Sequence, residues 1–340
     1  MQQPSPRAAV VAGLGATVPS RVVTNDMLAA RLDTSDEWIR RRTGIRQRHV
    51  VEPGEATSDL AVDAGALAIK SAAHNGVEGA DMVVLATTTP DHRCPATAPE
   101  VATRLGLRGV AAFDVAAVCS GFVYGLAVGA GAIAAGHVER VLVIGAEAFT
   151  TIINPEDRTT AAIFGDGAGA IVLRAGAADE PGALLGFDLG SDGSNAQLII
   201  VPAGGSRQRS DPNPPEPGSE YFTMQGAAVF RNAVIRMTES ARIVLGRTGW
   251  VIDEVDWFVG HQANIRILTA VADELGLPHS RAVINVDRVG NTSAASIPLA
   301  LADAAAAGRL QAGHRVLLTA FGGGLTWGSA TLRWPDLHIT

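Results

Sequence analysis

One cysteine stands where its thiol could act as a nucleophile. Cys119 follows an apolar, strand-like run at 111–115 and precedes a helical stretch rich in Gly and Ala. The amino end of a helix stabilises a thiolate, which is the reactive form of cysteine. By residue type alone, however, a cysteine before an Ala-rich helix is more often a small buried hydrophobic side chain. The chemistry of Cys119 therefore depends on what else the fold brings to it.

Two segments in the second half of the chain also place polar residues at the end of a predicted strand or the start of a predicted helix. His261 follows the apolar run 258–260, and Asn291 lies in a loop-like segment at 290–298. Taken separately, His261 could be a helix cap and Asn291 a turn former. Three glycines at 322–324 add a possible cluster of backbone N–H donors. Together, Cys, His, Asn and oriented N–H groups are the equipment for acyl transfer through a thioester.

The blocks around these three residues, with SDEWI at 35–39 and RTGI at 42–45, resemble the β-ketoacyl-[acyl-carrier-protein] synthase III family. The resemblance runs from about Ala8 to the C-terminus and keeps the order and spacing of every block. It implies an α/β thiolase fold, with two similar halves in five layers, α-β-α-β-α. It also implies a decarboxylative Claisen condensation, in which a primer from acyl-CoA is held on a cysteine and extended by malonyl-acyl-carrier protein to a β-ketoacyl product.

The resemblance gives each matching position an expected role. Cys119 would carry the acyl group, while His261 and Asn291 would hydrogen-bond the malonyl thioester oxygen as CO₂ leaves. The backbone N–H groups of Cys119 and Gly323 would bind the oxyanion, and losing one such donor typically costs ~3 kcal/mol of barrier. The positions expected to bind CoA, with Trp38 stacking on the adenine, are Trp38, Arg42, Thr43, Arg158, Met224, Phe230, Ala263 and Asn264.

The expected partners are acyl-CoA, malonyl-acyl-carrier protein and a second copy of the chain in a homodimer. Arg231 and Arg266 would meet the acidic carrier protein, although Asp273 stands where family members often place a basic residue. Cys94 would reach into the acyl pocket of the other subunit, at a position where a bulky aromatic restricts the pocket to acetyl groups. No metal and no cofactor are expected.

Related activities remain as alternatives. The nearest is the same chemistry in a specialised pathway, such as polyketide starter priming or acyl transfer to a non-carrier acceptor. A thiolase would have a second cysteine where Phe321 stands, and a hydroxymethylglutaryl-type synthase would need a glutamate that the Cys119 block lacks. A chalcone-type synthase would lack the Trp38 block, and a silent partner subunit would have lost the nucleophile. The glycine runs at 11–15 and 164–169 do not complete a nucleotide-binding motif.

The elements that must position these residues follow an α/β rhythm. A chain of 340 residues suggests roughly two domains, and apolar runs alternate with helical patterns. The rhythm restarts in the second half, where we expect helices at 222–245, 265–275 and 297–307 and a strand at 316–321. We therefore expect one half at 1–180 carrying the nucleophile and another at 181–340 carrying His and Asn. Residues 203–219 read as a long surface loop.

Composition excludes several other classes. The net charge of −7, with no long basic run, argues against a nucleic-acid partner, and Lys70 is the single lysine available for Schiff-base chemistry. The uncharged run 115–136 is long enough to span a bilayer, but its Gly/Ala composition favours a buried helix and no membrane association. Two cysteines and no evident secretory signal point to a reduced, cytoplasmic location.

Overall fold

Two β-sheets form the frame of the protein, whose computed structural model describes residues 7–338. The five-stranded sheet has the order β1-β7-β6-β4-β5, and the four-stranded sheet has the order β11-β12-β13-β8. The strands of the first sheet are β1 (Ala8–Thr17), β4 (Met82–Ala86), β5 (Ala111–Val115), β6 (Arg140–Glu147) and β7 (Gly167–Gly176). Those of the second are β8 (Leu184–Ser191), β11 (Trp257–Gly260), β12 (Arg315–Gly322) and β13 (Thr326–Arg333).

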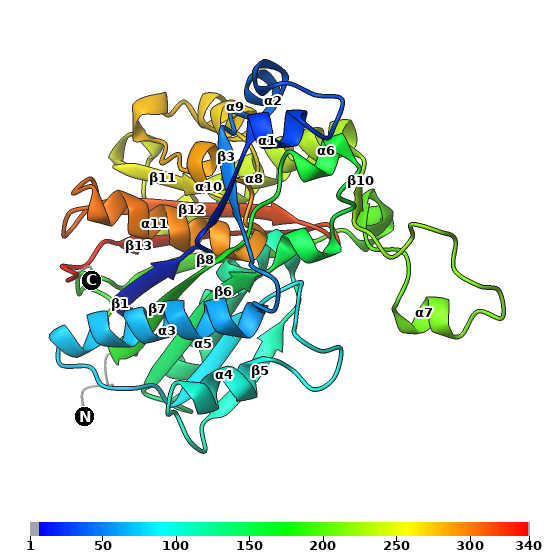
Figure 1. Ribbon diagram of the computed structural model, residues 1–340. Helices are drawn as coiled ribbons and strands as arrows, with labels where there is room; N and C mark the ends of the chain where they lie inside the picture. The colour runs from blue at the N-terminus through cyan, green and yellow to red at the C-terminus, as the bar shows by residue number, and fades with distance from the viewer. Residues whose placement is uncertain (1–6, 339–340) are drawn as a thin grey trace, which may run out of the picture.

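Helices separate and cover the two sheets, so the molecule has the five α-β-α-β-α layers that the sequence resemblance implies (Figure 1). On the outer face of the five-stranded sheet lie α3 (Thr57–His74) and α4 (Ala98–Arg104). Between the sheets lie α5 (Gly121–Ala134) and α11 (Ser296–Ala306). On the outer face of the four-stranded sheet lie α8 (Gly226–Thr248) and α9 (Ile265–Leu275).

The middle layer explains the uncharged run that could have been a membrane span. Helix α5 buries Phe122, Val123 and Leu126 against both sheets, in the same core as Ile297 and Ala300 of α11. A helix with apolar sheets on two sides is apolar around most of its circumference. In the described part of the chain, no helix is long and apolar enough to cross a membrane.

A segment of the first half packs on the second half. Helices α1 (Asn25–Ala29) and α2 (Asp36–Thr43) follow β2 (Arg21–Thr24) and lie beside α9 (Figure 1). The remaining short elements are β3 (Gln47–Val50), η1 (Val118–Ser120), η2 (Phe149–Ile152), α6 (Arg158–Ala161), η3 (Gly193–Leu198), β9 (Ile199–Ile200), α7 (Ser206–Arg209), β10 (Thr223–Met224), η4 (Ile252–Glu254), η5 (His279–Arg281), α10 (Val286–Val289) and η6 (Ser293–Ala295). Residues 1–6, on which the expectation of no secretory signal partly rests, lie outside the described residues.

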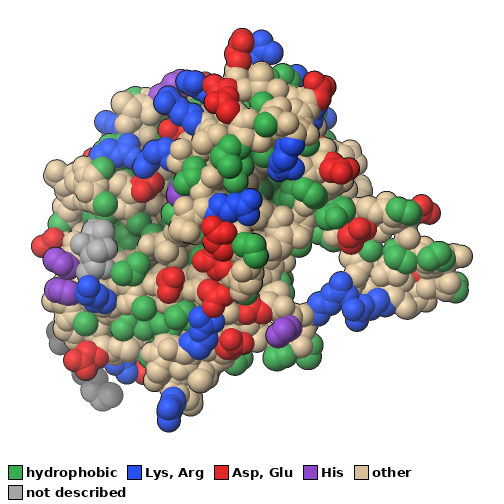
Figure 2. Space-filling model, in the orientation of Figure 1, with side chains coloured by type: hydrophobic (Ala, Val, Ile, Leu, Met, Phe, Trp, Pro, Cys, Tyr) green, Lys and Arg blue, Asp and Glu red, His purple; other side chains and the backbone are tan. Residues whose placement is uncertain are grey.

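Two predicted boundaries differ from the structure. The helix expected from 222 begins at Gly226, because Thr223 and Met224 pair with β9 as a short strand. The loop expected at 203–219 contains the short helix α7 and projects from the body as an arm (Figure 1). Figure 2 shows basic side chains on this arm near the body, where α7 carries Arg207 and Arg209.

Candidate active site

Cys119 lies on a tight turn between β5 and α5. The residue before it, Val118, has a φ of 46°, a left-handed conformation that a β-branched residue rarely adopts. Such strain persists where the surrounding structure holds it, commonly at functional sites. The chain at Gly322 also comes very close, because a Cβ there would lie 2.7 Å from the Cys119 backbone nitrogen. The glycine run therefore packs directly against the nucleophile turn, with Gly323 beside Val118.

The Cys119 thiol is buried and protonated in the free protein. Its side chain is 9% exposed, and burial raises the pKa of the thiol to about 12. Ser293 lies beside the thiol, and the nearby Glu147 carboxyl adds to the rise in this pKa. Burial thus acts against the thiolate that the helix end was expected to stabilise. Acylation must include removal of the thiol proton.

His261 follows β11 and is held as a neutral ring. Its backbone N–H donates to Thr319, and burial lowers the pKa of the imidazole to about 3. The ring Nδ1 lies 2.7 Å from the Ser296 hydroxyl, which also accepts the Gln262 backbone N–H at 3.3 Å. The Ser296 proton is then free to point at Nδ1, which leaves Nε2 protonated. His261 can therefore donate a hydrogen bond to a substrate oxygen without carrying charge.

Asn291 is fixed by its own loop with its amide nitrogen free for substrate. Its side-chain oxygen accepts the Ser293 backbone N–H at 2.9 Å, and its backbone bonds to Ile163 and Gly165. Two residues later Ser293 contacts Cys119, and Ser296 contacts His261. The segment 291–296 thus brings the expected trio to one place.

A cavity of about 640 Å³ leads to this place. Asn291 is the member of the trio that lines it. Of the positions expected to bind CoA, seven line the cavity, namely Trp38, Arg42, Thr43, Met224, Phe230, Ala263 and Asn264. Lining residues that the sequence did not single out are Thr159, Thr160, Ala162, Ile163, Gly226, Ala227, Val229 and Ile267. A cavity of this size and mixed lining is typical of sites for small organic ligands.

Cations surround the indole at the mouth of this cavity. The guanidinium of Arg42 lies 4.7 Å from the Trp38 ring centre and that of Arg158 lies 5.4 Å from it. Arg158 does not line the cavity, and it pairs with Asp33 at 3.0 Å. Trp38, Arg42 and Arg158 together offer stacking and charge to a nucleotide.

Two of the expected CoA contacts use polar side-chain atoms inside the protein. The Thr43 hydroxyl donates to Ile39 at 2.7 Å and accepts from Ile45 at 3.0 Å. The Asn264 side-chain oxygen caps α9 by accepting from Ile267 at 3.0 Å. Thr43 therefore gives the cavity shape more than hydrogen bonds, whereas Asn264 keeps its amide N–H₂ for a substrate.

The two arginines expected at the carrier-protein surface line the same cavity. Arg266 lies over the Phe230 ring at 5.5 Å, and Arg231 follows Phe230 on α8. Asp273, the position that departs from the basic pattern, is exposed and bonds to His279 at 2.7 Å.

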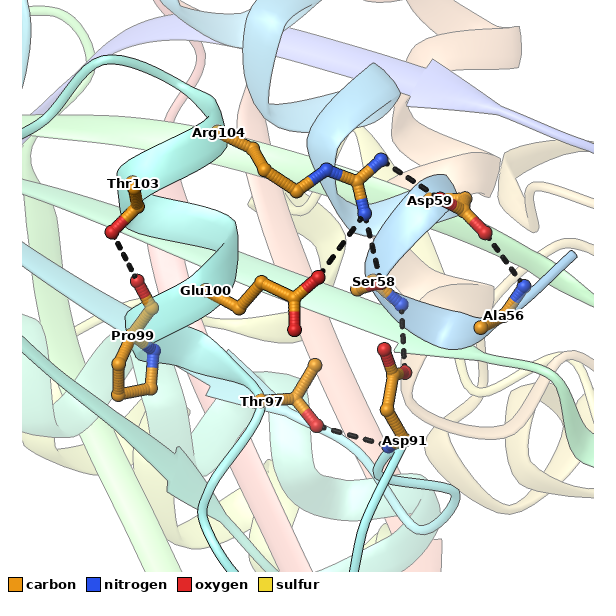
Figure 3. Close-up of polar contacts among 9 residues, drawn as sticks. All are labelled: Ala56, Ser58, Asp59, Asp91, Thr97, Pro99, Glu100, Thr103 and Arg104. Carbon is orange, nitrogen blue, oxygen red and sulfur yellow. Dashed lines mark hydrogen bonds and ion pairs between the residues drawn. The ribbon is translucent and has the colours of Figure 1, made fainter.

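Cys94 lies exposed on the loop between β4 and α4 and does not line the cavity. Both ends of its loop are anchored. Asp91 accepts the Ser58 backbone N–H at 3.0 Å, and its own N–H donates to Thr97 at 3.0 Å (Figure 3). Arg104 of α4 ties Ser58 into the same network (Figure 3).

Sequence reasoning missed Glu147, Ser293 and Ser296. Both serines lie inside the block that was singled out for Asn291, and Glu147 directly follows the apolar run 141–146. A carboxyl after a buried strand was the available signal. The Cys119 block itself contains no glutamate, but the sheet brings one from β6 to its side.

Comparisons with known proteins place the chain among condensing enzymes. The family model described as 3-oxoacyl-[acyl-carrier-protein (ACP)] synthase III matches residues 113–193, and its C-terminal model matches 245–334. The chain is 63% identical to β-ketoacyl-[acyl-carrier-protein] synthase III 5 of Streptomyces coelicolor, over 97% of this chain and 98% of that protein.

Solved structures agree in fold. The crystal structure of 3-oxoacyl-(acyl carrier protein) synthase III from Pseudomonas aeruginosa PAO1 has a TM-score of 0.91 and 52% identity, over 97% of this chain and 99% of that one. The priming β-ketosynthase of the R1128 polyketide pathway has a TM-score of 0.89 and 32% identity, over 99% of both chains.

Proposed function

Because this chain belongs to the 3-oxoacyl-[acyl-carrier-protein] synthase III family, we propose that it condenses an acyl-CoA primer with malonyl-acyl-carrier protein, releasing CO₂ and CoA and giving a β-ketoacyl product. One observation carries the assignment of residues. The segment 291–296 contacts Cys119 through Ser293 and His261 through Ser296, and it contains Asn291, which lines the cavity.

In the first half-reaction, Cys119 takes the acyl group from CoA. The pantetheine arm lies in the cavity, with the nucleotide at Trp38, Arg42 and Arg158. The tetrahedral oxyanion is bound by the backbone N–H groups of Cys119 and Gly323. The close packing of the glycine run against the Cys119 turn supports this oxyanion hole.

In the second half-reaction, malonyl-acyl-carrier protein occupies the same cavity. As CO₂ leaves, the thioester oxygen gains negative charge, which His261 Nε2 and the Asn291 amide stabilise by donating hydrogen bonds. The low pKa of His261 supports this role because a neutral donor needs no proton transfer. The carbanion attacks the acyl-Cys119 carbonyl and the cysteine sulfur leaves. No cofactor beyond the acyl-CoA substrate is part of this proposal.

The acidic carrier protein docks at Arg231 and Arg266. Both line the cavity through which the carrier's prosthetic arm must enter, and opposite charges favour productive encounter.

The active form in this proposal is a cytoplasmic homodimer. A nucleophilic thiol must stay reduced, and both cysteines of the chain are free, which supports a reducing compartment. The edge strand β5 and the partly exposed face of α5 support the dimer, as argued below at the scale of the whole molecule.

Fatty-acid initiation is favoured over polyketide priming. Identity to the Streptomyces coelicolor and Pseudomonas aeruginosa synthases is 63% and 52%, against 32% to the R1128 priming enzyme.

The test is intact-protein mass spectrometry with a panel of acyl-CoAs, followed by malonyl-acyl-carrier protein. Each chain should gain one acyl group and lose it on condensation. Cys119→Ala should gain none, whereas Cys94→Ala should still be acylated. A labelled acyl group that persists in Cys119→Ala would remove the assignment.

A further inference from the structure

A buried carboxyl beside the nucleophile has no role in the chemistry described so far. Glu147, at the end of β6, is 0% exposed, and burial raises its pKa, while the groups that lower it are hydroxyl and N–H groups of Thr88, Thr89 and Ser293. An isolated carboxylate in such a place is costly unless it is hydrogen-bonded or protonated. A neutral side chain would avoid this cost, so a carboxyl at this position calls for a function.

Hydrogen bonds connect this carboxyl to the nucleophile. The Ser293 hydroxyl donates to Glu147 Oε1 at 3.0 Å, and Ser293 also lies beside the Cys119 thiol, because η6 packs on η1. Since the serine proton points at the carboxylate, the serine oxygen is left to accept from the thiol. The three groups form a directed chain from sulfur to carboxylate.

The backbone holds this chain of contacts under strain. Ser293 has a φ of 48°, and Val118 beside the nucleophile has a φ of 46°. The loop also approaches β6 so closely that a Cβ on Gly145 would lie 2.4 Å from the Ala294 carbonyl oxygen. Strained residues on both sides of one contact indicate that the contact itself is required.

We infer that Glu147, acting through Ser293, accepts the Cys119 proton during acylation and returns it when condensation releases the cysteine. This deepens the proposed function and rests on it. Ser293 touches the reacting sulfur and is a catalytic residue, while Glu147 is a positioning residue that holds the proton.

The steps balance. The Cys119 S–H proton moves to Ser293 Oγ as the Ser293 proton moves to Glu147 Oε1. The sulfur forms its bond to the acyl carbon, the bond from that carbon to the CoA sulfur breaks, and the CoA thiolate takes a proton from solvent. Later the malonyl carboxylate leaves as CO₂, the carbanion attacks acyl-Cys119, and the released thiolate regains its proton from Glu147 through Ser293.

Electrostatics favour this cycle. Burial raises the pKa of Glu147 to about 7, which is close to the range where a general base works best. During condensation the protonated carboxyl is neutral, so no buried negative charge stands beside the developing enolate. His261 is not needed as a base, in keeping with its role as a donor to that enolate.

Few other titratable groups face Glu147. Cys119 lies on η1, and Asp166, just before β7, holds the Thr150 and Val51 backbone N–H groups instead. The remaining partners, from the end of β4 and from η6, are hydroxyl and N–H groups of Thr87, Thr88, Thr89, Ser293 and Ala294. On α3, which packs on β6, Asp63 and Lys70 are exposed and Asp59 pairs with Arg104.

The experiment measures the single-turnover loading rate of Cys119 from acyl-CoA between pH 5 and 9. The wild-type rate should rise with pH and level off above an apparent pKa near 7. Glu147→Gln should load at least ~100-fold more slowly and without this plateau, with KM for acyl-CoA little changed. Ser293→Gly removes the hydroxyl without adding strain at positive φ, and should show the same loss. Asp166→Asn is the matched control, a second buried carboxyl outside the relay, and should keep the wild-type profile.

Infrared difference spectra of the loaded enzyme give a second readout. A protonated-carboxyl band should appear on acylation of the wild type and of Asp166→Asn, and be absent in Glu147→Gln. If Glu147→Gln and Ser293→Gly both fold and both keep the loading rate and pH profile of the wild type, the inference is overturned. A wild type that does not load at all would instead overturn the proposed function. If Glu147→Gln does not fold, Ser293→Gly and the infrared band of the wild type decide.

Discussion

At the catalytic residues, hydrogen bonds made inside the protein decide which atoms remain for substrate. Asn291 uses its oxygen on Ser293 and keeps its N–H₂, and His261 uses Nδ1 on Ser296 and keeps Nε2. Both residues therefore present donors. Donors suit an enolate oxygen that gains charge, and they are poor acceptors for a thiol proton.

The division of labour between the two half-reactions can be tested on these donors. His261→Ala and Asn291→Ala should still load Cys119 but lose condensation by ~10²- to 10³-fold each, because each removes a donor that acts mainly in the transition state. Loading is followed by intact mass and condensation by product formation. His279→Ala, an exposed histidine, is the control. Loss of loading with intact malonyl decarboxylation would reverse the roles.

The protonation of Glu147 also has a consequence for stability. Its pKa is raised from 4.5 to about 7 in the folded protein, so its contribution is fully present below pH 4.5 and is lost as pH rises through 7. This shift corresponds to about 3 kcal/mol. His261, with its pKa lowered to about 3, acts in the opposite sense and loses its contribution as pH falls below 6.5. A comparison of variant with wild type isolates Glu147.

Glu147→Gln should therefore gain unfolding free energy relative to the wild type as pH rises from 4.5 to 8, by up to about 3 kcal/mol. Denaturant unfolding at several pH values measures it. Glu180→Gln is a control that should show no change in this window, since Arg174 lowers the pKa of that carboxyl and its contribution is lost only as pH falls below 4.5. A pH-independent difference for Glu147→Gln would mean that this carboxyl does not titrate in the window.

At this scale the sequence could predict the residue types that meet substrate but not their protonation. Cys119, His261 and Asn291 stand out because each lies in a block with a matching family pattern. Burial, which raises one pKa and lowers another, depends on packing from both halves of the chain. The helix that starts just after Cys119 suggested a thiolate, whereas burial of the thiol raises its pKa.

At the scale of elements, strands and long helices were predictable because apolar residues must face a core. The helices at α9 and α11 fall within one residue of their expected ranges, and Gly276 ends α9 in the left-handed conformation. The short strand β10 was missed since its two residues look like the start of α8. The approach of η6 to β6, which places Ser293 on Glu147, depends on three-dimensional packing and leaves no local pattern.

The loop with Cys94 is the element that should set primer choice. Its ends are anchored by Asp91 and Thr97, so a side chain at its tip has a defined position (Figure 3). Cysteine is several carbon atoms smaller than phenylalanine, and each buried CH₂ of a longer primer could gain roughly 0.8 kcal/mol. We therefore expect a preference for primers longer or more branched than acetyl.

The test compares kcat/KM for acetyl-, isobutyryl- and hexanoyl-CoA. Cys94→Phe should shift the preference toward acetyl by ~10-fold or more, within the range that hydrophobic pockets achieve per methylene. Ala96→Phe, also exposed on this loop, adds the same bulk at a position without the expected role. Leu198 and Phe164 are buried, and refilling of the space by either side chain would leave the profile unchanged. An unchanged profile in Cys94→Phe, or a wild type that favours acetyl-CoA, would remove the basis for this expectation.

At the scale of the whole molecule, one flank of the five-stranded sheet is left open. Strand β5 is an edge strand, and an unpaired edge is a ready template for pairing with another chain. Helix α5, which contacts β5, has no charged residue and yet leaves Val128 40% exposed on its open face. An apolar helix face beside a free sheet edge is typical of a surface that a second subunit covers.

We expect a homodimer in which this flank is the interface. Light scattering at micromolar concentration should give twice the mass of the 35.0 kDa chain.

Val128→Arg places a charge in the proposed contact, so it should shift the mass toward the monomer while thermal unfolding stays cooperative. Val251→Arg is the matched control. Val251 is equally apolar and 61% exposed, but it lies directly before η4, away from β5. Since Cys94 is expected to act across the subunit boundary, the Val128→Arg monomer should also lose its primer preference. A monomeric wild type would rule out the dimer. A Val128→Arg variant that stays dimeric while Val251→Arg dissociates would place the contact elsewhere.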